Sequence, residues 1–236
     1  METPQQQAVI QAALARFESK EKTRILAFGS SNTEHRILGT HWFDVFDLAL
    51  KKKYGRFHHC INTGIGGDTT AHLLARFEED AAFYRPHLVF LTVGGNDFRK
   101  IDSVEQIRDN YRELHRRFAA LGTPVIFQTY YSPDPERTGP LERFFEVMEI
   151  MREVAAETGS GLIDQLRRWE LFRNAAPQQY APLMMDGFHV NERGNRLMGL
   201  ELTAAFGIGE VLCEQEELAE AREIQALINR LDPRKR

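Results

Sequence analysis

Cysteine is scarce in this sequence. Cys60 and Cys213 are the only two among 236 residues, and they lie far apart, one in an apolar run and the other in the charged C-terminal region. We therefore expect no structural disulfide, and so little cysteine is typical of a protein from a reducing compartment. Neither cysteine has a second Cys or a His at the spacing of a zinc site.

Long apolar runs and an excess of positive charge are also absent. No window reaches the ~20 apolar residues of a membrane span, and the N-terminus METPQQQAVIQAALARF lacks the basic flank and apolar run of a signal peptide. The formal charge is −4, with no stripe of Lys and Arg. These absences argue against a nucleic-acid partner and a membrane span. They predict a cytoplasmic protein that acts on a small, uncharged or near-neutral molecule.

The overall composition is that of a globular protein. Hydrophobic residues make up 42% of the chain and charged residues 27%, which is enough apolar material for a full core. No internal repeat, low-complexity tract or long Pro/Gly-rich linker divides the sequence. We predict a single domain over residues 1–236, of which residues 210–236 form a charged helical tail.

Short apolar runs alternate with longer amphipathic segments, as in βαβ units of a parallel sheet. The apolarity of the runs is nearly continuous, so we expect strands that are covered by helices on both faces. The predicted strands are residues 24–29, 57–62, 88–93, 124–130 and 161–164.

Helical periodicity is clearest in one central segment. Ser103 is placed to cap its start, and apolar residues follow at spacings of three and four. These residues are Val104, Ile107, Tyr111, Leu114 and Phe118.

The tail has a thinner apolar stripe along a charged helix over residues 210–230. It could pack on the body of the protein or on a second copy to form a homo-oligomer, and the sequence leaves both open. The stripe includes Leu218, Ile224, Leu227, Ile228 and Leu231.

Three polar segments directly follow predicted strands, and a fourth lies near the C-terminus. They are FGSSNT (28–33), NTGIGGDTT (62–70), GGND (94–97) and DGFHVNERG (186–194). The carboxyl ends of parallel strands meet at one edge of a sheet, so the first three segments are expected to lie together.

These segments contain every group that acyl transfer requires. Ser31 is the candidate nucleophile, exposed where a helix is expected to begin. His189 is the candidate general base, and Asp186 would fix its tautomer. The backbone N–H groups of Ser31 and Gly67 and the side-chain amide of Asn96 would bind the oxyanion.

In this order, the segments resemble the sequence blocks of the SGNH, or GDSL-type, serine hydrolases. The resemblance extends from about residue 24 to about residue 199 and assigns Ser31, Gly67, Asn96 and His189 to the four name-giving positions, with Asp186 completing the triad. It implies a three-layer α/β/α sandwich, flavodoxin-like, with a five-stranded, mainly parallel sheet. The absence of a G-x-S-x-G motif argues against the α/β-hydrolase fold.

The chain departs from the family pattern near the nucleophile and the base. Ser30 stands where aspartate is usual, Asn32 where an apolar residue is common, and Val190 where proline is frequent. One alternative is therefore a catalytically silent binding protein with this fold.

The resemblance implies an acyl-enzyme on Ser31 and no metal or organic cofactor. Family members act on acetylated sugars, lysophospholipids, thioesters and simple esters. We expect a small-molecule ester substrate with a short acyl group, such as an acetylated carbohydrate. Lysophospholipase and thioesterase activities are the alternatives within the family, and a metal-dependent hydrolase using Asp186 and His189 is a further one.

Other residues near the strand ends carry weaker predictions. Phe98 and Tyr131 are expected to contact substrate. His58 and His59 should point to opposite faces of a strand, where both are expected to be structural. The pair 184–185, two methionines, is expected to pack in the core, with a role as an acyl-pocket wall as the alternative.

Overall fold

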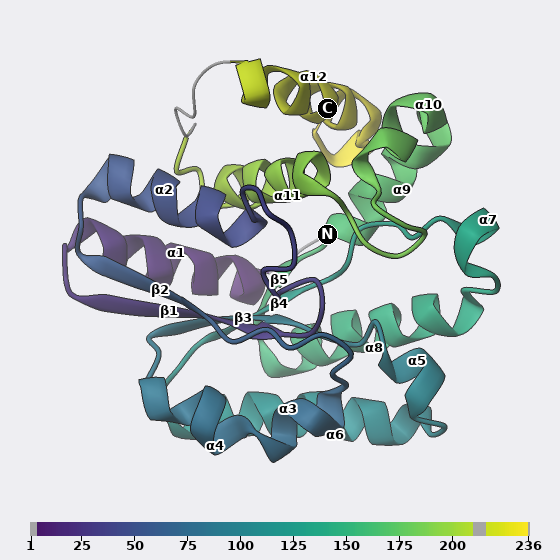
Figure 1. Ribbon diagram of the computed structural model, residues 1–236. Helices are drawn as coiled ribbons and strands as arrows, with labels where there is room; N and C mark the ends of the chain where they lie inside the picture. Colours follow the sequence, from purple (N-terminus) through teal and green to yellow (C-terminus); the bar gives the residue numbers. More distant parts are fainter. Residues whose placement is uncertain (1–3, 210–215, 236) are drawn as a thin grey trace.

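The computed structural model of the protein describes residues 4–209 and 216–235. In this part of the chain, five strands form one sheet that lies between two layers of helices (Figure 1). The strands are β1 (Thr23–Gly29), β2 (His58–Asn62), β3 (Leu88–Thr92), β4 (Val125–Gln128) and β5 (Gly161–Ile163).

The strand order is β2-β1-β3-β4-β5, and every neighbouring pair is parallel. This is the flavodoxin-like order, so the predicted fold class is confirmed. The chain leaves β1 toward β2 and then returns to β3 on the other side of β1. Loops therefore diverge at the carboxyl ends of β1 and β3, which is where ligands bind in such sheets.

Strands β1, β3, β4 and β5 bury side chains on both faces, which explains their continuous apolarity, whereas the edge strand β2 is only partly buried. Successive side chains along a strand point to opposite faces, and so Ile25 and Ala27 join one core cluster while Leu26 and Phe28 join the other.

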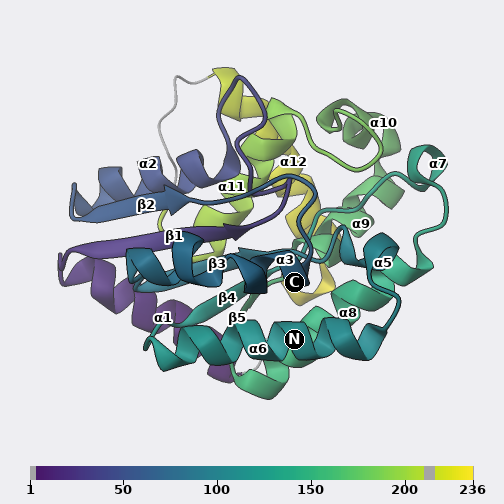
Figure 2. The ribbon, with the colours of Figure 1, turned by 60° about the horizontal axis from the view of Figure 1, so that its bottom comes forward.

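The helices divide between the two faces in the same way (Figure 1). One layer contains α1 (Pro4–Glu18), α2 (Trp42–Tyr54), α9 (Gln165–Ala175), α11 (Glu192–Ala205) and α12 (Glu216–Leu231). The other contains α3 (Thr70–Ala75), α4 (Phe77–Asp80), α6 (Val104–Ala120) and α8 (Glu142–Thr158), and Figure 2 shows α6 and α8 side by side. Short elements lie between them: η1 (Ala82–Tyr84), α5 (Asp97–Lys100), α7 (Pro135–Thr138), α10 (Pro177–Tyr180) and η2 (Ala181–Leu183). A further short element, η3 (Pro233–Lys235), follows α12.

Helix α6 follows the predicted pattern. The Ser103 hydroxyl accepts a hydrogen bond from the Gln106 N–H at 3.2 Å and caps the helix. The four later members of the stripe, from Ile107 to Phe118, are fully buried. These buried side chains hold α6 in the core on its side of the sheet.

The apolar stripe of α12 packs on the body of the same chain. Ala221, Ile224 and Ile228 are buried, in one cluster with core residues of α11, and α12 contacts α9 and α11. Residues 210–215, including Cys213, and the side chain of Leu218 lie outside the described residues. Within the described chain, no helix is long and apolar enough to cross a membrane.

Candidate active site

Ser31 lies in a tight turn directly after β1. The backbone N–H groups of Thr33 and Glu34 both donate to the Ser30 carbonyl oxygen at 2.9 Å. The expected helix does not begin here, since the next helix, α2, starts only at Trp42. The Asn32 carbonyl oxygen accepts from Trp42 Nε1 at 2.7 Å instead of from a following helical turn. A turn, and not a helix terminus, therefore presents the Ser31 hydroxyl.

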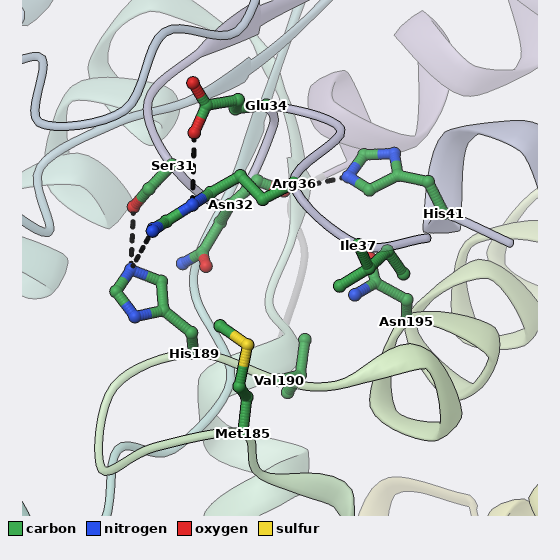
Figure 3. A pocket seen from close by; sticks show the side chains of 10 residues that line it. All are labelled: Ser31, Asn32, Glu34, Arg36, Ile37, His41, Met185, His189, Val190 and Asn195. Carbon is green, nitrogen blue, oxygen red and sulfur yellow. Dashed lines mark hydrogen bonds and ion pairs between the residues drawn. The ribbon is translucent and has the colours of Figure 1, made fainter. Parts of the chain in front are cut away.

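The three predicted triad residues are brought together. Ser31 Oγ lies 3.0 Å from His189 Nε2, and His189 Nδ1 lies 2.8 Å from Asp186 Oδ2 (Figure 3 shows the Ser31–His189 contact). An ionised carboxylate can only accept, so Nδ1 carries the ring proton and Nε2 presents its lone pair to Ser31. This is the geometry that a general base needs to take the hydroxyl proton.

Asp186 is held in the charged form. Its partial burial acts to raise its pKa, but hydrogen bonds from the Phe188 N–H (2.6 Å) and from the His189 ring outweigh this, and the net pKa is lowered. The His189 N–H donates to the same carboxylate at 2.7 Å. A carboxylate fixed in this way orients the imidazole and stabilises the imidazolium that proton transfer creates.

Tyr131 supports this loop from below and does not face a substrate. Its side chain is fully buried, and its hydroxyl accepts from the Val190 N–H at 3.0 Å and lies 2.7 Å from both Asn32 Oδ1 and the Phe188 carbonyl oxygen. These contacts argue against the predicted substrate contact. Tyr131 instead links the turn of the nucleophile to the loop of the base.

Phe98 also acts through its neighbours. Its side chain is buried, and its ring stacks on that of Phe188 at 5.9 Å between centroids and packs edge-on against Phe144. Phe98 therefore belongs to an aromatic cluster that packs against the loop of His189, and it is not among the residues that line the pocket at Ser31.

The two glycine-rich segments meet the nucleophile turn as predicted. Asn62 Nδ2 donates to the Thr33 carbonyl oxygen at 2.7 Å, and the Ser30 N–H donates to the Thr92 carbonyl oxygen, at the end of β3, at 3.2 Å. Asn96 Nδ2 donates to the Asp68 carbonyl oxygen at 2.9 Å, which joins the segments 62–70 and 94–97.

The predicted oxyanion donors are available in this arrangement. In the described part of the chain, neither the Ser31 N–H nor the Gly67 N–H has a hydrogen-bond partner. Gly67 has φ +84°, a conformation that favours glycine. One hydrogen of the Asn96 amide is used by Asp68, so the other is left to donate.

Ser30 has a structural role that explains part of the departure from the family pattern. Its hydroxyl is fully buried and lies 2.7 Å from the Tyr130 hydroxyl. An aspartate here would place a carboxylate in the same closed space, where a charge is costly. The serine–tyrosine pair instead joins the nucleophile turn to the loop that follows β4.

A pocket of about 290 Å³ of empty space, open to solvent, surrounds Ser31 and His189. Figure 3 shows its lining, which mixes polar and apolar side chains. The lining residues are Ser31, Asn32, Glu34, Arg36, Ile37, His41, Met185, His189, Val190 and Asn195. Of the two methionines, Met184 is buried in the core and Met185 lines the pocket.

Arg36 occupies a position beside the base that sequence reasoning did not assign. Its Nη1 lies 3.2 Å from His189 Nε2, and its Nε pairs with Glu34 Oε2 at 3.2 Å (Figure 3). A guanidinium can only donate. Arg36 and the Ser31 hydroxyl therefore share the lone pair of Nε2.

Asn32 is a second residue whose role the sequence did not reveal. It is 7% exposed, and its Oδ1 lies against the Tyr131 hydroxyl, which fixes the orientation of the amide. Its Nδ2 is buried and has no partner among the described residues. Asn32, which lines the pocket beside Ser31, thus has an unused hydrogen-bond donor.

The metal-site alternative at Asp186 and His189 lacks ligands. Within the described residues, no third His, Cys, Asp or Glu side chain joins this pair at metal-binding distance. Both side chains are already used in the contact with each other and with Ser31.

Solved structures with the same fold include two acetyl xylan esterases. Axe2, an acetylxylan esterase from Geobacillus stearothermophilus, matches with a TM-score of 0.69 at 22% identity, over 83% of this chain and 98% of that chain. The acetyl xylan esterase AlAXEase matches with a TM-score of 0.69 at 20% identity, over 77% of this chain and 98% of that chain. At these identities the likeness shows the fold.

The sequence comparisons identify the family. An acetylxylan esterase from Geobacillus stearothermophilus is 25% identical over 150 residues, which are 58% of this chain and 67% of that protein. The model of the GDSL-like lipase/acylhydrolase family matches residues 27–197, a range that contains Ser31, Gly67, Asn96, Asp186 and His189. The protein therefore belongs to the GDSL-like lipase/acylhydrolase family of carboxylic ester hydrolases.

Proposed function

We propose that this protein is a serine esterase that removes short acyl groups, acetyl above all, from esterified carbohydrates. The observation that carries the catalytic assignment is the continuous contact from Ser31 Oγ to His189 Nε2 and from His189 Nδ1 to Asp186, at 3.0 and 2.8 Å. Ser31 lies more than 150 positions before His189 and Asp186 in the sequence, yet the three meet as nucleophile, base and carboxylate, the arrangement that nucleophilic acyl transfer uses.

In the first half of the reaction, Ser31 Oγ attacks the acyl carbonyl while His189 Nε2 takes its proton. The tetrahedral intermediate collapses when His189 gives this proton to the leaving alcohol, and the acyl group remains on Ser31. In the second half, His189 takes a proton from the water that attacks the acyl carbonyl. It then gives this proton to Ser31 Oγ as the acid is released, which restores free Ser31 and neutral His189.

The negative charge on the carbonyl oxygen needs donors that are already in place. We assign this role to the Ser31 and Gly67 N–H groups, which have no other partner in the described chain, and to the remaining Asn96 amide hydrogen. Donors held by the surrounding fold stabilise the developing charge without reorganisation.

The preference for a short acyl group follows from the pocket. The space beside Ser31 is open to solvent, and its lining mixes polar and apolar side chains. Ile37, Met185 and Val190 provide limited apolar surface among polar neighbours. The acetylxylan esterase that is 25% identical to this chain supports an acetylated carbohydrate as the substrate class.

Asn32 adds a polar contact that fits a carbohydrate. Asn32 lines the pocket, and its buried Nδ2 has no hydrogen-bond partner within the described residues; an unpaired buried donor costs about 1–3 kcal/mol. A sugar hydroxyl or the ester oxygen can accept this hydrogen bond, which an unsubstituted aliphatic chain cannot. We propose Asn32 as a substrate contact.

The test is a panel of p-nitrophenyl esters from acetate to palmitate, beside acetylated xylooligosaccharides. We expect activity that falls beyond butyrate, and release of acetate from the sugars. Ser31→Ala should lose nearly all activity while it remains folded. Ser19→Ala, the same change at an exposed serine, is the matched control and should leave the rate unchanged.

The same panel separates the alternatives. A peak at long chains or on lysophospholipids would overturn the short-acyl assignment, and a preference for thioesters would indicate a thioesterase. An organophosphonate should label Ser31 at one equivalent per chain. A protein whose mass does not change on long exposure, or a Ser31→Ala variant as active as the parent, would overturn the enzymatic mechanism.

A further inference from the structure

A second cluster of reactive side chains lies between α2 and the edge strand β2. His58 and Cys60 are two residues apart on β2, so their side chains share one face of the strand. Asp47 of α2 lies over that face. One ligand atom from each of the three residues lies within 4.8 Å of the other two.

The two histidines of β2 separate as predicted. The side chain of His58 is 3% exposed and faces α2, whereas His59 is exposed. His58 is therefore enclosed with two other groups that can bind a cation. Spacing along the sequence did not reveal this set because the third member comes from a helix.

The hydrogen bonds within the cluster are poor. His58 Nε2 lies 3.3 Å from Asp47 Oδ1, yet this oxygen is buried and has no hydrogen bond of good geometry. The same ring nitrogen lies 3.4 Å from the Asp47 carbonyl oxygen. A buried carboxylate oxygen that His58 contacts only at this distance is incompletely satisfied, and a cation between these atoms would satisfy it.

We propose that Asp47, His58 and Cys60 form a zinc-binding site. A carboxylate oxygen, an imidazole nitrogen and a thiolate sulfur are all ordinary zinc ligands, and thiolate with imidazole selects zinc over magnesium or calcium. Water would complete four-coordinate geometry on the side of Asp47, whose side chain is 20% exposed.

Zinc binding to this cluster would release one proton. Burial, and then the Asp47 charge, raise the Cys60 pKa, so the thiol is protonated without metal. Zinc binding releases this proton, and His58 binds through a deprotonated Nε2. Lys51, which pairs with the other Asp47 oxygen Oδ2, is 43% exposed and can keep that contact or turn to solvent.

The site would have a structural role. It joins the middle of α2 to the outermost strand of the sheet. None of the three residues lines the pocket at Ser31. Esterase activity and metal binding are therefore separable.

The experiment is a titration of the chelator-treated full-length protein with Co²⁺, then with Zn²⁺ against a chromophoric chelator. We expect one equivalent of metal and a thiolate-to-cobalt charge-transfer band in the near ultraviolet. Cys60→Ser should abolish the band, and His58→Ala should weaken zinc binding by more than about 100-fold, since loss of even an outer-shell partner costs about 10–100-fold.

Matched controls are His59→Ala, at the exposed neighbour, and Cys213→Ser, at the other cysteine; both should bind metal like the parent. Because the band is measured first on the unaltered chain, a variant that folds poorly does not decide the outcome. No band on the parent, or a band that survives Cys60→Ser, would overturn the zinc site. Hydrolysis of p-nitrophenyl acetate by the metal-free parent is measured separately and tests only the esterase.

Discussion

Removal of the Tyr131 hydroxyl should damage both stability and catalysis, although the residue does not contact substrate. In Tyr131→Phe the Val190 N–H loses its acceptor, and either Asn32 Oδ1 or the Phe188 carbonyl oxygen loses a donor, because one hydroxyl hydrogen serves only one of them. The ring itself remains packed against Trp169. The change is therefore confined to the hydrogen bonds between the loops of Ser31 and His189.

The magnitude follows from two buried groups without partners. Each costs about 1–3 kcal/mol, and at the lower end of that range the free energy of unfolding falls by about 2 kcal/mol. In a protein of this size each 1 kcal/mol shifts Tm by about 2–4 °C, so we expect a decrease of roughly 4–8 °C. Because Phe188 and Val190 flank His189, a shift of about 1 Å in the imidazole would lower kcat up to about 100-fold.

The assays are thermal unfolding and steady-state hydrolysis of p-nitrophenyl acetate. The matched control is Tyr54→Phe, which removes a hydroxyl that is buried without a partner within the described chain, so this variant should be at least as stable as the parent. If Tyr131→Phe has the Tm and kcat of the parent, the bridge between the loops is not needed. If both variants lose stability equally, the loss does not come from the hydrogen bonds of Tyr131.

Three further predictions concern the residues around the pocket. Arg36→Met removes a donor that competes with the Ser31 hydroxyl for His189 Nε2. A hydrogen bond is worth about 1 kcal/mol, so organophosphonate labelling of Ser31 should become about fivefold faster. An unchanged or slower labelling rate would contradict this. Asn96→Ala should lower kcat by about 10²–10³ with little change in KM, and a kcat within a few-fold of the parent's would exclude the amide from the oxyanion site. Burial, and then the His35 charge, lower the His41 pKa to about 3, so the folded state does not take up the proton that the unfolded state binds below about 6.5. Urea unfolding should therefore show the parent losing more stability than His41→Asn as the pH falls from 7 to 4.5, and parallel profiles would be the contrary result.

The elements could be predicted because their causes are local in sequence. The stripe of α6 indicates which face of that helix is buried, and the continuous apolarity of β1 and β3 indicates that both faces of those strands are buried. The structure contains these elements at nearly the predicted bounds. The end of one strand was predicted wrongly: β4 ends at Gln128, before the predicted Tyr130. The next residues, Tyr130 and Tyr131, lie in the loop after β4, where their hydroxyls contact Ser30 and Asn32.

The candidate site could be predicted in part. Ser31, Asp186 and His189 were identified by residue type and order, and they meet in space. Phe98 and Tyr131 were expected at the substrate because they follow strand ends. Position after a strand places a residue at the correct edge of the sheet, but it does not tell whether the side chain points into the pocket or beneath it.

The sequence by itself determined the alternation of strands and helices, the family and the groups that acyl transfer uses, because periodicity and short motifs are properties of neighbouring residues. Tertiary structure alone decided that Tyr131 joins two catalytic loops, that Arg36 shares the lone pair of His189, and that Asp47 faces His58 and Cys60. The physical reason is that hydrogen bonds and ligand geometry depend on distances of a few ångströms between segments. Such distances are fixed only when the sheet and its two layers of helices pack together.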